Sequence, residues 1–282
     1  MIEDSKEILS SFYRERTYWC GNSFKLVSVV PRFELQEEKS KQGRGKNQNV
    51  SRPAQATLNK RNAKKYFRLL VDGNFEPGDL FITFTYQGKF IPKTPQDAKK
   101  ELSNFFKRLR RRLKKYGKAD QLKYVVVTEY REKTEKQKEI RVHHHLIMNN
   151  IIDRDELEEL WTKKVKKKTI RIGTANTKRV RNDNEYNLDR LAKYMCGYKK
   201  EDNRVREWSS SKKNLKRPKT RQPADKKYRR SKIESIGRSN DCGQEFFEKK
   251  YPDYFVTIEH IHENKYSGFH YYLKLEKKER GG

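Results

Sequence analysis

The chain has 282 residues, of which 38% are charged and 33% hydrophobic, and its formal net charge at pH 7 is +30. A positive excess this large indicates a polyanionic partner, and nucleic acid is the commonest one. No run of about 18 apolar residues occurs, which excludes a transmembrane helix, and the acidic start MIEDSKEILS lacks a signal-peptide core, so we expect a protein of the cytoplasm that does not bind a membrane. Three widely spaced cysteines exclude a disulfide scaffold and a CxxC zinc module.

The first part of the chain, residues 1–75, is interpreted as an N-terminal extension. A strand is expected within residues 17–33. Residues 36–60 are polar, with Gly43 and Gly45, and predict a linker. A helix is expected over about 54–70.

The middle of the chain has clearer periodicity. DLFITFTYQ (79–87) is rich in β-branched and aromatic residues and predicts a strand. Thr94-Pro95-Gln96-Asp97 then supplies a capping residue, a proline at the first helical position and an acid in the first turn. The apolar residues that follow have helical spacing: Ala98, Leu102, Phe105, Phe106, Leu109 and Leu113.

The elements expected after this helix indicate the fold class. They are a strand at 122–130, a charged turn at 131–139, a strand at 140–148, a helix at 153–165, a short strand at 168–174 and a helix at 186–199. The order β-α-β-β-α-β-α predicts an α+β fold, in which an antiparallel sheet of the split βαβ type carries packed helices.

The last part of the chain, residues 203–282, is a basic C-terminal region expected to bind nucleic acid. Its segment 203–232 is rich in lysine and arginine. From about Tyr251 aromatic and polar residues alternate, which predicts a hairpin.

Three adjacent histidines stand in the strand RVHHHLIM. Side chains alternate along a strand, so His143 and His145 project together while His144 points to the opposite face. Two imidazoles in this arrangement can converge on a divalent metal, and the hairpin places Glu129 beside them as a third ligand. A His₂-carboxylate set leaves coordination positions open, as a catalytic metal requires. The alternative is that these histidines are ordinary polar surface residues of a strand.

A second histidine pair has the same spacing. Glu259-His260-Ile261-His262 lies in the C-terminal region and is followed by further polar residues. We rank it below the first pair as a metal site.

Two tyrosines, Tyr194 and Tyr198, lie one turn apart on the helix predicted at 186–199. Both stand at the edge of the apolar stripe that this helix presents to a core. They are therefore either boundary packing residues or nucleophiles.

Five motifs in this order resemble the HUH endonuclease superfamily: TFTY (83–86), FFKRLRRRL (105–113), KYVVVTE (123–129), HHHLIM (143–148) and AKYMCGY (192–198). Within that superfamily the chain is most similar to the rolling-circle replication initiators, or Rep proteins, of small single-stranded DNA phages and bacterial plasmids. The resemblance covers about residues 76–200, and we place the nuclease domain at 76–202.

The resemblance implies a chemistry and a ligand set. His143, His145 and Glu129 would bind Mg²⁺ or Mn²⁺, and Tyr194 and Tyr198 would nick single-stranded DNA and transfer the strand through a covalent 5′-phosphotyrosine. The implied partners are single-stranded DNA and replication-origin DNA in a bacterial host cell, with a host helicase and polymerase. Gly197 stands where related initiators often have a lysine, so Lys193 or Lys199 would take that role. The residues expected to contact nucleic acid are Lys107, Arg108, Arg110, Arg111, Lys193, Lys199 and Trp208.

Two other interpretations stay open. A relaxase or single-strand transposase of the same superfamily would keep the chemistry, although a plasmid relaxase usually has its tyrosine before the histidine pair. A nucleic-acid-binding protein without enzymatic activity would explain the charge equally well.

Overall fold

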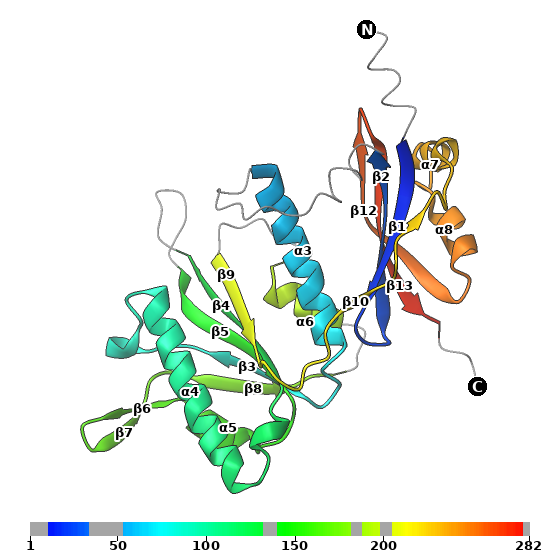
Figure 1. Cartoon of the computed structure of the whole chain (residues 1–282). Coiled ribbons are helices and arrows are strands. Elements are labelled where there is room, and N and C mark those ends of the chain that lie inside the picture. Colours follow the sequence, from blue (N-terminus) through cyan, green and yellow to red (C-terminus); the bar gives the residue numbers. More distant parts are fainter. Residues whose placement is uncertain (1–10, 34–52, 132–139, 182–187, 198–204, 279–282) are drawn as a thin grey trace, which may run out of the picture. The chain divides into compact units, whose positions relative to one another are not determined.

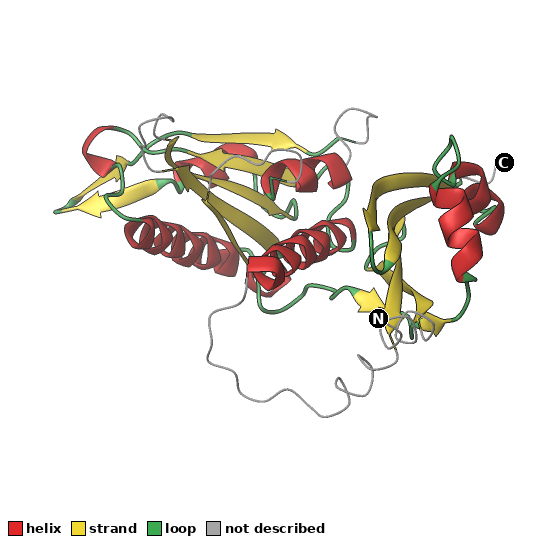
Figure 2. Cartoon of the chain, turned by 90° about the horizontal axis from the view of Figure 1, so that it is seen from above, coloured by secondary structure: helices red, strands yellow, loops and turns green. Residues whose placement is uncertain are grey.

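The structure is a computed structural model that describes residues 11–33, 53–131, 140–181, 188–197 and 205–278. The chain divides into a central unit, residues 61–216, and a terminal unit formed by residues 1–60 and 217–282. Each unit consists of an antiparallel sheet with packed helices (Figures 1 and 2). The predicted α+β class is confirmed. No helix within the described ranges is long and apolar enough to cross a membrane.

The central unit contains a five-stranded sheet in the order β8-β3-β5-β4-β9. Its strands are β3 (Leu80–Phe84), β4 (Tyr124–Arg131), β5 (Ile140–Met148), β8 (Ala175–Arg179) and β9 (Val205–Ser210). All neighbours are antiparallel. In chain order the first four positions read fourth, first, third and second, which is the split βαβ arrangement. The strand that carries the histidines is therefore central.

One face of this sheet is covered by the two crossover helices, α4 (Pro95–Lys115) and α5 (Arg154–Glu159). Right-handed crossovers place both helices on the same side. Thr94 caps α4, because its hydroxyl accepts a hydrogen bond from the Asp97 amide. All six apolar positions predicted from the spacing are buried. Phe105, Trp161 and Phe84 form the aromatic centre of this core.

The opposite face is covered by α3 (Pro53–Asp72) and α6 (Leu188–Met195). Phe67 and Leu70 of α3 and Met195 of α6 pack on Val127 and Ile147 of the sheet. Neither helix belongs to the βαββαβ repeat. The two cores thus lie on opposite sides of the same strands.

The expected helix at 153–165 is wrong beyond Glu159. Asp153 caps α5 as its position suggests, but the chain then forms a two-stranded hairpin of β6 (Thr162–Val165) and β7 (Lys168–Arg171). Thr162, Val165, Thr169 and Ile170 are β-branched, which favours strands over a continued helix. The hairpin is inserted between α5 and β8.

The terminal unit contains a second antiparallel sheet, in the order β10-β1-β2-β13-β12 with β11 beside β1. Its elements are β1 (Ser11–Trp19), β2 (Phe24–Phe33), β10 (Lys219–Thr220), β11 (Ala224–Asp225), α7 (Arg230–Gly237), α8 (Gln244–Lys250), β12 (Tyr254–Asn264) and β13 (Gly268–Lys277). Helices α7 and α8 pack on one face over Tyr271, Val29 and Phe247. The hairpin predicted after Tyr251 is confirmed.

Strand β13 pairs with β2, so the two extensions contribute to one sheet. Ion pairs and hydrogen bonds within this unit reinforce the pairing. Arg14 of β1 binds Asp225 of β11 through two contacts of 2.5 and 2.7 Å. Glu15 accepts hydrogen bonds from Lys227, Tyr228 and Tyr251.

Candidate metal centre

The register of the central sheet brings the predicted ligands together. Glu129 of β4 pairs directly with His143 of β5, and His145 lies two residues further along the same face. Each histidine Nε2 atom is 3.9 Å from Glu129 Oε2. The ligand atoms of all three residues lie within 4.8 Å of one another. Among the described residues this is the group that could hold a metal ion.

The surroundings orient the donor atoms toward a common point. His145 Nδ1 is hydrogen-bonded to Thr83 Oγ1 at 3.2 Å, and His143 Nδ1 to the Arg141 carbonyl at 3.0 Å. Both Nε2 atoms therefore remain available, and such outer contacts fix the ring orientation of metal-binding histidines. Donors that share one ion at about 2.1 Å lie at most about 4.2 Å apart, so the two 3.9 Å separations fit.

The middle histidine of the triplet belongs to the core on the other face. His144 is fully buried, with its ring nitrogens hydrogen-bonded to Tyr86 Oη at 2.7 Å and Thr128 Oγ1 at 2.9 Å. Burial, together with the neighbouring His143 and His145, lowers the pKa of His144 to about 3. It stays neutral at physiological pH. The three adjacent histidines thus divide into a facing pair and one structural core residue.

Tyr194 is the tyrosine that the structure brings to this group. Its hydroxyl lies 3.5 Å from His145 Nε2, and the two rings are 5.2 Å apart between centroids. The side chain is 58% exposed, so its hydroxyl can be approached from solvent. Tyr198 and Lys199 lie outside the described residues.

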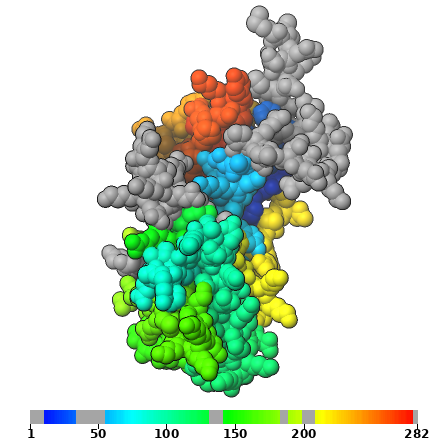
Figure 3. All heavy atoms as spheres, turned by 90° about the vertical axis from the view of Figure 1, so that its left-hand side faces the viewer, coloured from blue at the N-terminus to red at the C-terminus, as the bar shows by residue number. Residues whose placement is uncertain are grey.

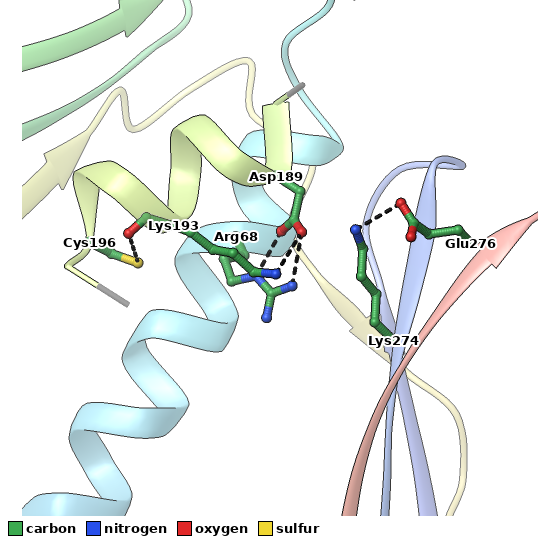
Figure 4. Close-up of polar contacts among 6 residues, drawn as sticks. All are labelled: Arg68, Asp189, Lys193, Cys196, Lys274 and Glu276. Atoms are coloured by element: carbon green, nitrogen blue, oxygen red, sulfur yellow. Dashed lines mark hydrogen bonds and ion pairs between the residues drawn. The ribbon is translucent and has the colours of Figure 1, made fainter. Parts of the chain in front are cut away.

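Helix α6, which carries Tyr194, is held by charged contacts from α3 (Figure 4). The Arg68 guanidinium donates to both Asp189 carboxylate oxygens, at 2.7 and 3.1 Å. Lys193 also pairs with Asp189, at 3.1 Å. Lys64 donates to the Gly197 carbonyl, which is left without a helical partner at the end of α6.

This arrangement changes the expectation for Lys193, which the sequence assigned to nucleic acid and the structure commits to Asp189. Cys196 is buried beside the same network, and burial raises the pKa of its thiol to about 11. It is a packing residue in this core. Lys274, also drawn in Figure 4, pairs with Glu276 inside the terminal unit.

The basic residues expected on α4 lie on the face opposite the Glu-His-His group. Lys107, Arg110 and Arg111 are exposed. Arg108 is half-buried and donates to the Leu160 carbonyl, and burial lowers the pKa of its guanidinium. In the space-filling view the cyan and green atoms of α4 and its neighbours form the visible surface of the central unit (Figure 3). These cations therefore cannot reach a phosphate held at the metal group.

Trp208 is a half-buried residue of β9. Its ring stacks on Tyr66, with centroids 6.1 Å apart, and meets Phe67 edge-on at 5.6 Å. It helps fix α3 to the sheet. Base stacking by Trp208 stays a prediction, restricted to whatever part of the ring these contacts leave accessible.

The second histidine pair lies on the terminal-unit hairpin. The His260 and His262 rings are 6.5 Å apart, and His262 faces His270 across the strands at 5.8 Å. Within the described ranges these histidines do not form a group that could hold a metal. The lower ranking given to this pair is consistent with that geometry.

Sequence reasoning missed the residues that position the site. Thr83 was seen only as part of a strand, although its hydroxyl orients His145. Arg68 and Asp189 were not singled out, because the pairing joins positions 121 residues apart. One available signal was Asp189 itself, an acid within the predicted apolar stripe of α6.

A split βαβ sheet that carries Glu129, His143 and His145 on its central strands is compatible with the HUH class of replication proteins. Residues 79–202 match the family model of replication-associated protein ORF2, and through this domain the chain belongs to that family of rolling-circle Rep-like proteins. The family places the protein in DNA replication and implies binding to DNA of the replication origin. No curated protein and no solved structure matches the chain.

Proposed function

We propose that the protein is a rolling-circle replication initiator that nicks single-stranded origin DNA in a metal-dependent reaction and transfers the cut strand through a covalent 5′-phosphotyrosine. The nicking activity is assigned to the nuclease domain, residues 76–202. One observation carries the proposal. The Tyr194 hydroxyl lies 3.5 Å from His145 Nε2, beside a Glu-His-His group that could hold a metal ion.

The proposed cofactor is Mg²⁺ or Mn²⁺, bound by Glu129, His143 and His145. When bound, a divalent ion polarises a phosphoryl oxygen and stabilises developing negative charge. Imidazole donors are compatible with Mn²⁺ and with other first-row metals, so affinity alone does not select the ion.

The chain's own residues supply the nucleophile and its placement. The Tyr194 oxygen loses its proton and attacks phosphorus, forming a phosphotyrosine bond. The bond from phosphorus to the 3′ oxygen breaks, and that oxygen takes up a proton to leave a free 3′-OH. One phosphodiester is exchanged for another. A later attack by a 3′-OH on the phosphotyrosine therefore reseals DNA without a separate energy source.

Tyr198 is proposed as the second nucleophile, which would allow a second cleavage before the first linkage is released. It lies one helical turn beyond Tyr194 in the sequence. Host helicase and polymerase remain proposed partners, since the free 3′-OH is a primer end. The chain order favours an initiator over a plasmid relaxase, because Tyr194 follows the histidine pair.

The test is a covalent adduct assay. Labelled single-stranded oligonucleotides that tile the DNA around the gene are incubated with the protein and Mn²⁺, and adducts that survive denaturing electrophoresis are counted. We expect an adduct that is lost with EDTA and in His143→Ala, and reduced or lost in Tyr194→Phe. Oligonucleotide binding should be retained by both variants.

The matched control is the pair His260→Ala/His262→Ala, which removes two histidines of the same spacing from the other unit. It should form adduct at the wild-type rate. If no oligonucleotide yields an adduct with Mn²⁺ or Mg²⁺ while DNA binding persists, the enzymatic proposal fails and binding without catalysis is the better account.

A further inference from the structure

The β6–β7 hairpin, residues 162–171, is a basic ribbon that projects outward from the central unit (Figure 1). Its sequence TKKVKKKTIR contains neither an acid nor an aromatic residue. The exposed cations are Lys163, Lys164, Lys166, Lys167, Lys168 and Arg171. Among the described residues only Lys163 of this set pairs with a carboxylate, that of Glu101 on α4. The other five charges have no internal partner there.

The two faces of the ribbon differ. Residues directly opposite each other share a face, so Val165 and Ile170, both half-buried, lie on the same face as Lys163. That face is anchored to α4 through Glu101. The other face presents Thr162, Lys164, Thr169 and Arg171, which are hydroxyls and cations only.

The tip of the ribbon keeps a charge where turn chemistry favours another residue. Val165 pairs with Lys168, so Lys166 and Lys167 form a two-residue turn. Lys166 has a φ of 53°, in the left-handed region that glycine and asparagine adopt more easily. A lysine at this position is a local cost that turn formation does not explain, and such strain is common at functional positions.

The base of the ribbon lies at the end of the sheet that carries the metal group. Strand β3 pairs with His145 at Thr83 and with His144 at Phe84. The next residue, Thr85, accepts a hydrogen bond from Trp161 Nε1 before the ribbon. A Cβ atom at Gly173, just after the ribbon, would lie 1.9 Å from the Thr85 carbonyl oxygen, so this junction is held tightly.

We infer that the β6–β7 ribbon binds the phosphate backbone of a DNA duplex next to the nick site, with its Lys164/Arg171 face toward the groove. The major groove admits a two-stranded ribbon, and four residues per strand span about 13 Å, close to the groove width of about 12 Å. Binding of single strands commonly uses aromatic side chains as stacking platforms, and the ribbon has none. A duplex is therefore favoured over a single strand. The inference rests on the proposed function, because it takes origin DNA as the partner.

The experiment measures binding in EDTA, where no cleavage occurs, by fluorescence anisotropy across a range of salt concentrations. The probes are a 20-base-pair duplex and a single-stranded oligonucleotide of the same length. The test variant replaces Lys164, Lys166, Lys167 and Arg171 with glutamine. The control removes four exposed charges elsewhere by replacing Lys212, Lys213, Lys265 and Lys277 with glutamine.

We expect the ribbon variant to lose at least about tenfold in duplex affinity at 0.15 M salt, with a salt slope shallower by up to about 3.6, or 0.9 per phosphate contact. Single-strand affinity should fall much less, and the control should stay within about twofold of wild type. Arginine at the three lysine positions should restore duplex binding. The inference is overturned by equal losses in the ribbon and control variants, by a loss confined to the single strand, or by a loss of binding to anionic vesicles without a loss for the duplex.

A second variant guards against misfolding. Lys166→Gly relieves the left-handed lysine, so it should keep or raise the melting temperature while it weakens duplex binding. Unchanged duplex binding in this variant and in the quadruple variant would refute the ribbon as a contact. A wild-type protein that binds duplex through the ribbon but forms no adduct would refute the proposed function alone.

Discussion

The buried ion pair between α3 and α6 gives the most direct test of how the nucleophile is positioned. Arg68 and Asp189 have side chains that are 1% and 7% exposed. Removing one partner of a buried pair leaves an uncompensated charge and costs about 3–5 kcal/mol. We therefore expect Asp189→Asn to lower the free energy of unfolding of the central unit by about that amount. For a unit of about 150 residues, this corresponds to a fall of roughly 6–20 °C in melting temperature.

The functional consequence is measured at a temperature where the variant is still folded. Displacement of α6 moves the Tyr194 hydroxyl away from His145, and misplacement by about 1 Å can slow a reaction about a hundredfold. Adduct formation should therefore slow more than DNA binding weakens. Arg68→Met/Asp189→Leu, which replaces the pair by apolar side chains, should recover most of the stability. An Asp189→Asn variant that loses less than about 1 kcal/mol, or that forms adduct at the wild-type rate, would refute this account.

Three further results are expected. Mn²⁺ at about 100 times its Kd should raise the free energy of unfolding of the central unit by about 2.7 kcal/mol, as measured by urea titration, and Glu129→Gln should lose this gain. Burial alone would raise the pKa of Glu15, but hydrogen bonds from Lys227, Tyr228 and Tyr251 outweigh it and lower the pKa below 4.5. This carboxylate therefore stabilises the terminal unit above pH 4.5 and progressively less as pH falls below it, so Glu15→Gln should flatten the acid limb of the unfolding curve; an unchanged acid limb would contradict this. Thr94→Ala should cost about 1 kcal/mol through loss of the α4 cap, whereas Thr220→Ala, at an exposed position, should change stability little.

Local patterns were sufficient for the central strands and for α4. The alternation in DLFITFTYQ and the capping signature at Thr94 each act within a few residues, and both elements form as expected. The helix expected to reach Val165 failed because a single Asp153 cap fixes where a helix starts but not where it ends. Pairing of β2 with β13 joins segments at opposite ends of the chain, and no local periodicity reports such a contact.

The candidate metal group was predictable because alternation and a hairpin are enough to bring Glu129, His143 and His145 to one face. The place of Tyr194 beside His145 was expected from the family resemblance, since nothing in the residues alone says which face α6 covers. Trp208 was misjudged in its surroundings, because the sequence gives no sign that the segment around it becomes an edge strand packed under α3.

The metal-binding strands and the nucleophile-bearing helix come from different parts of the architecture. Both crossover helices occupy one face of the sheet, so the site face is roofed by α3 and α6, which stand outside the repeated motif. Such a roof can diverge while the strands beneath it are inherited unchanged. Relatives could thus acquire a new reach or a different nucleophile by exchanging one helix and its clasp, without rebuilding the metal-binding floor.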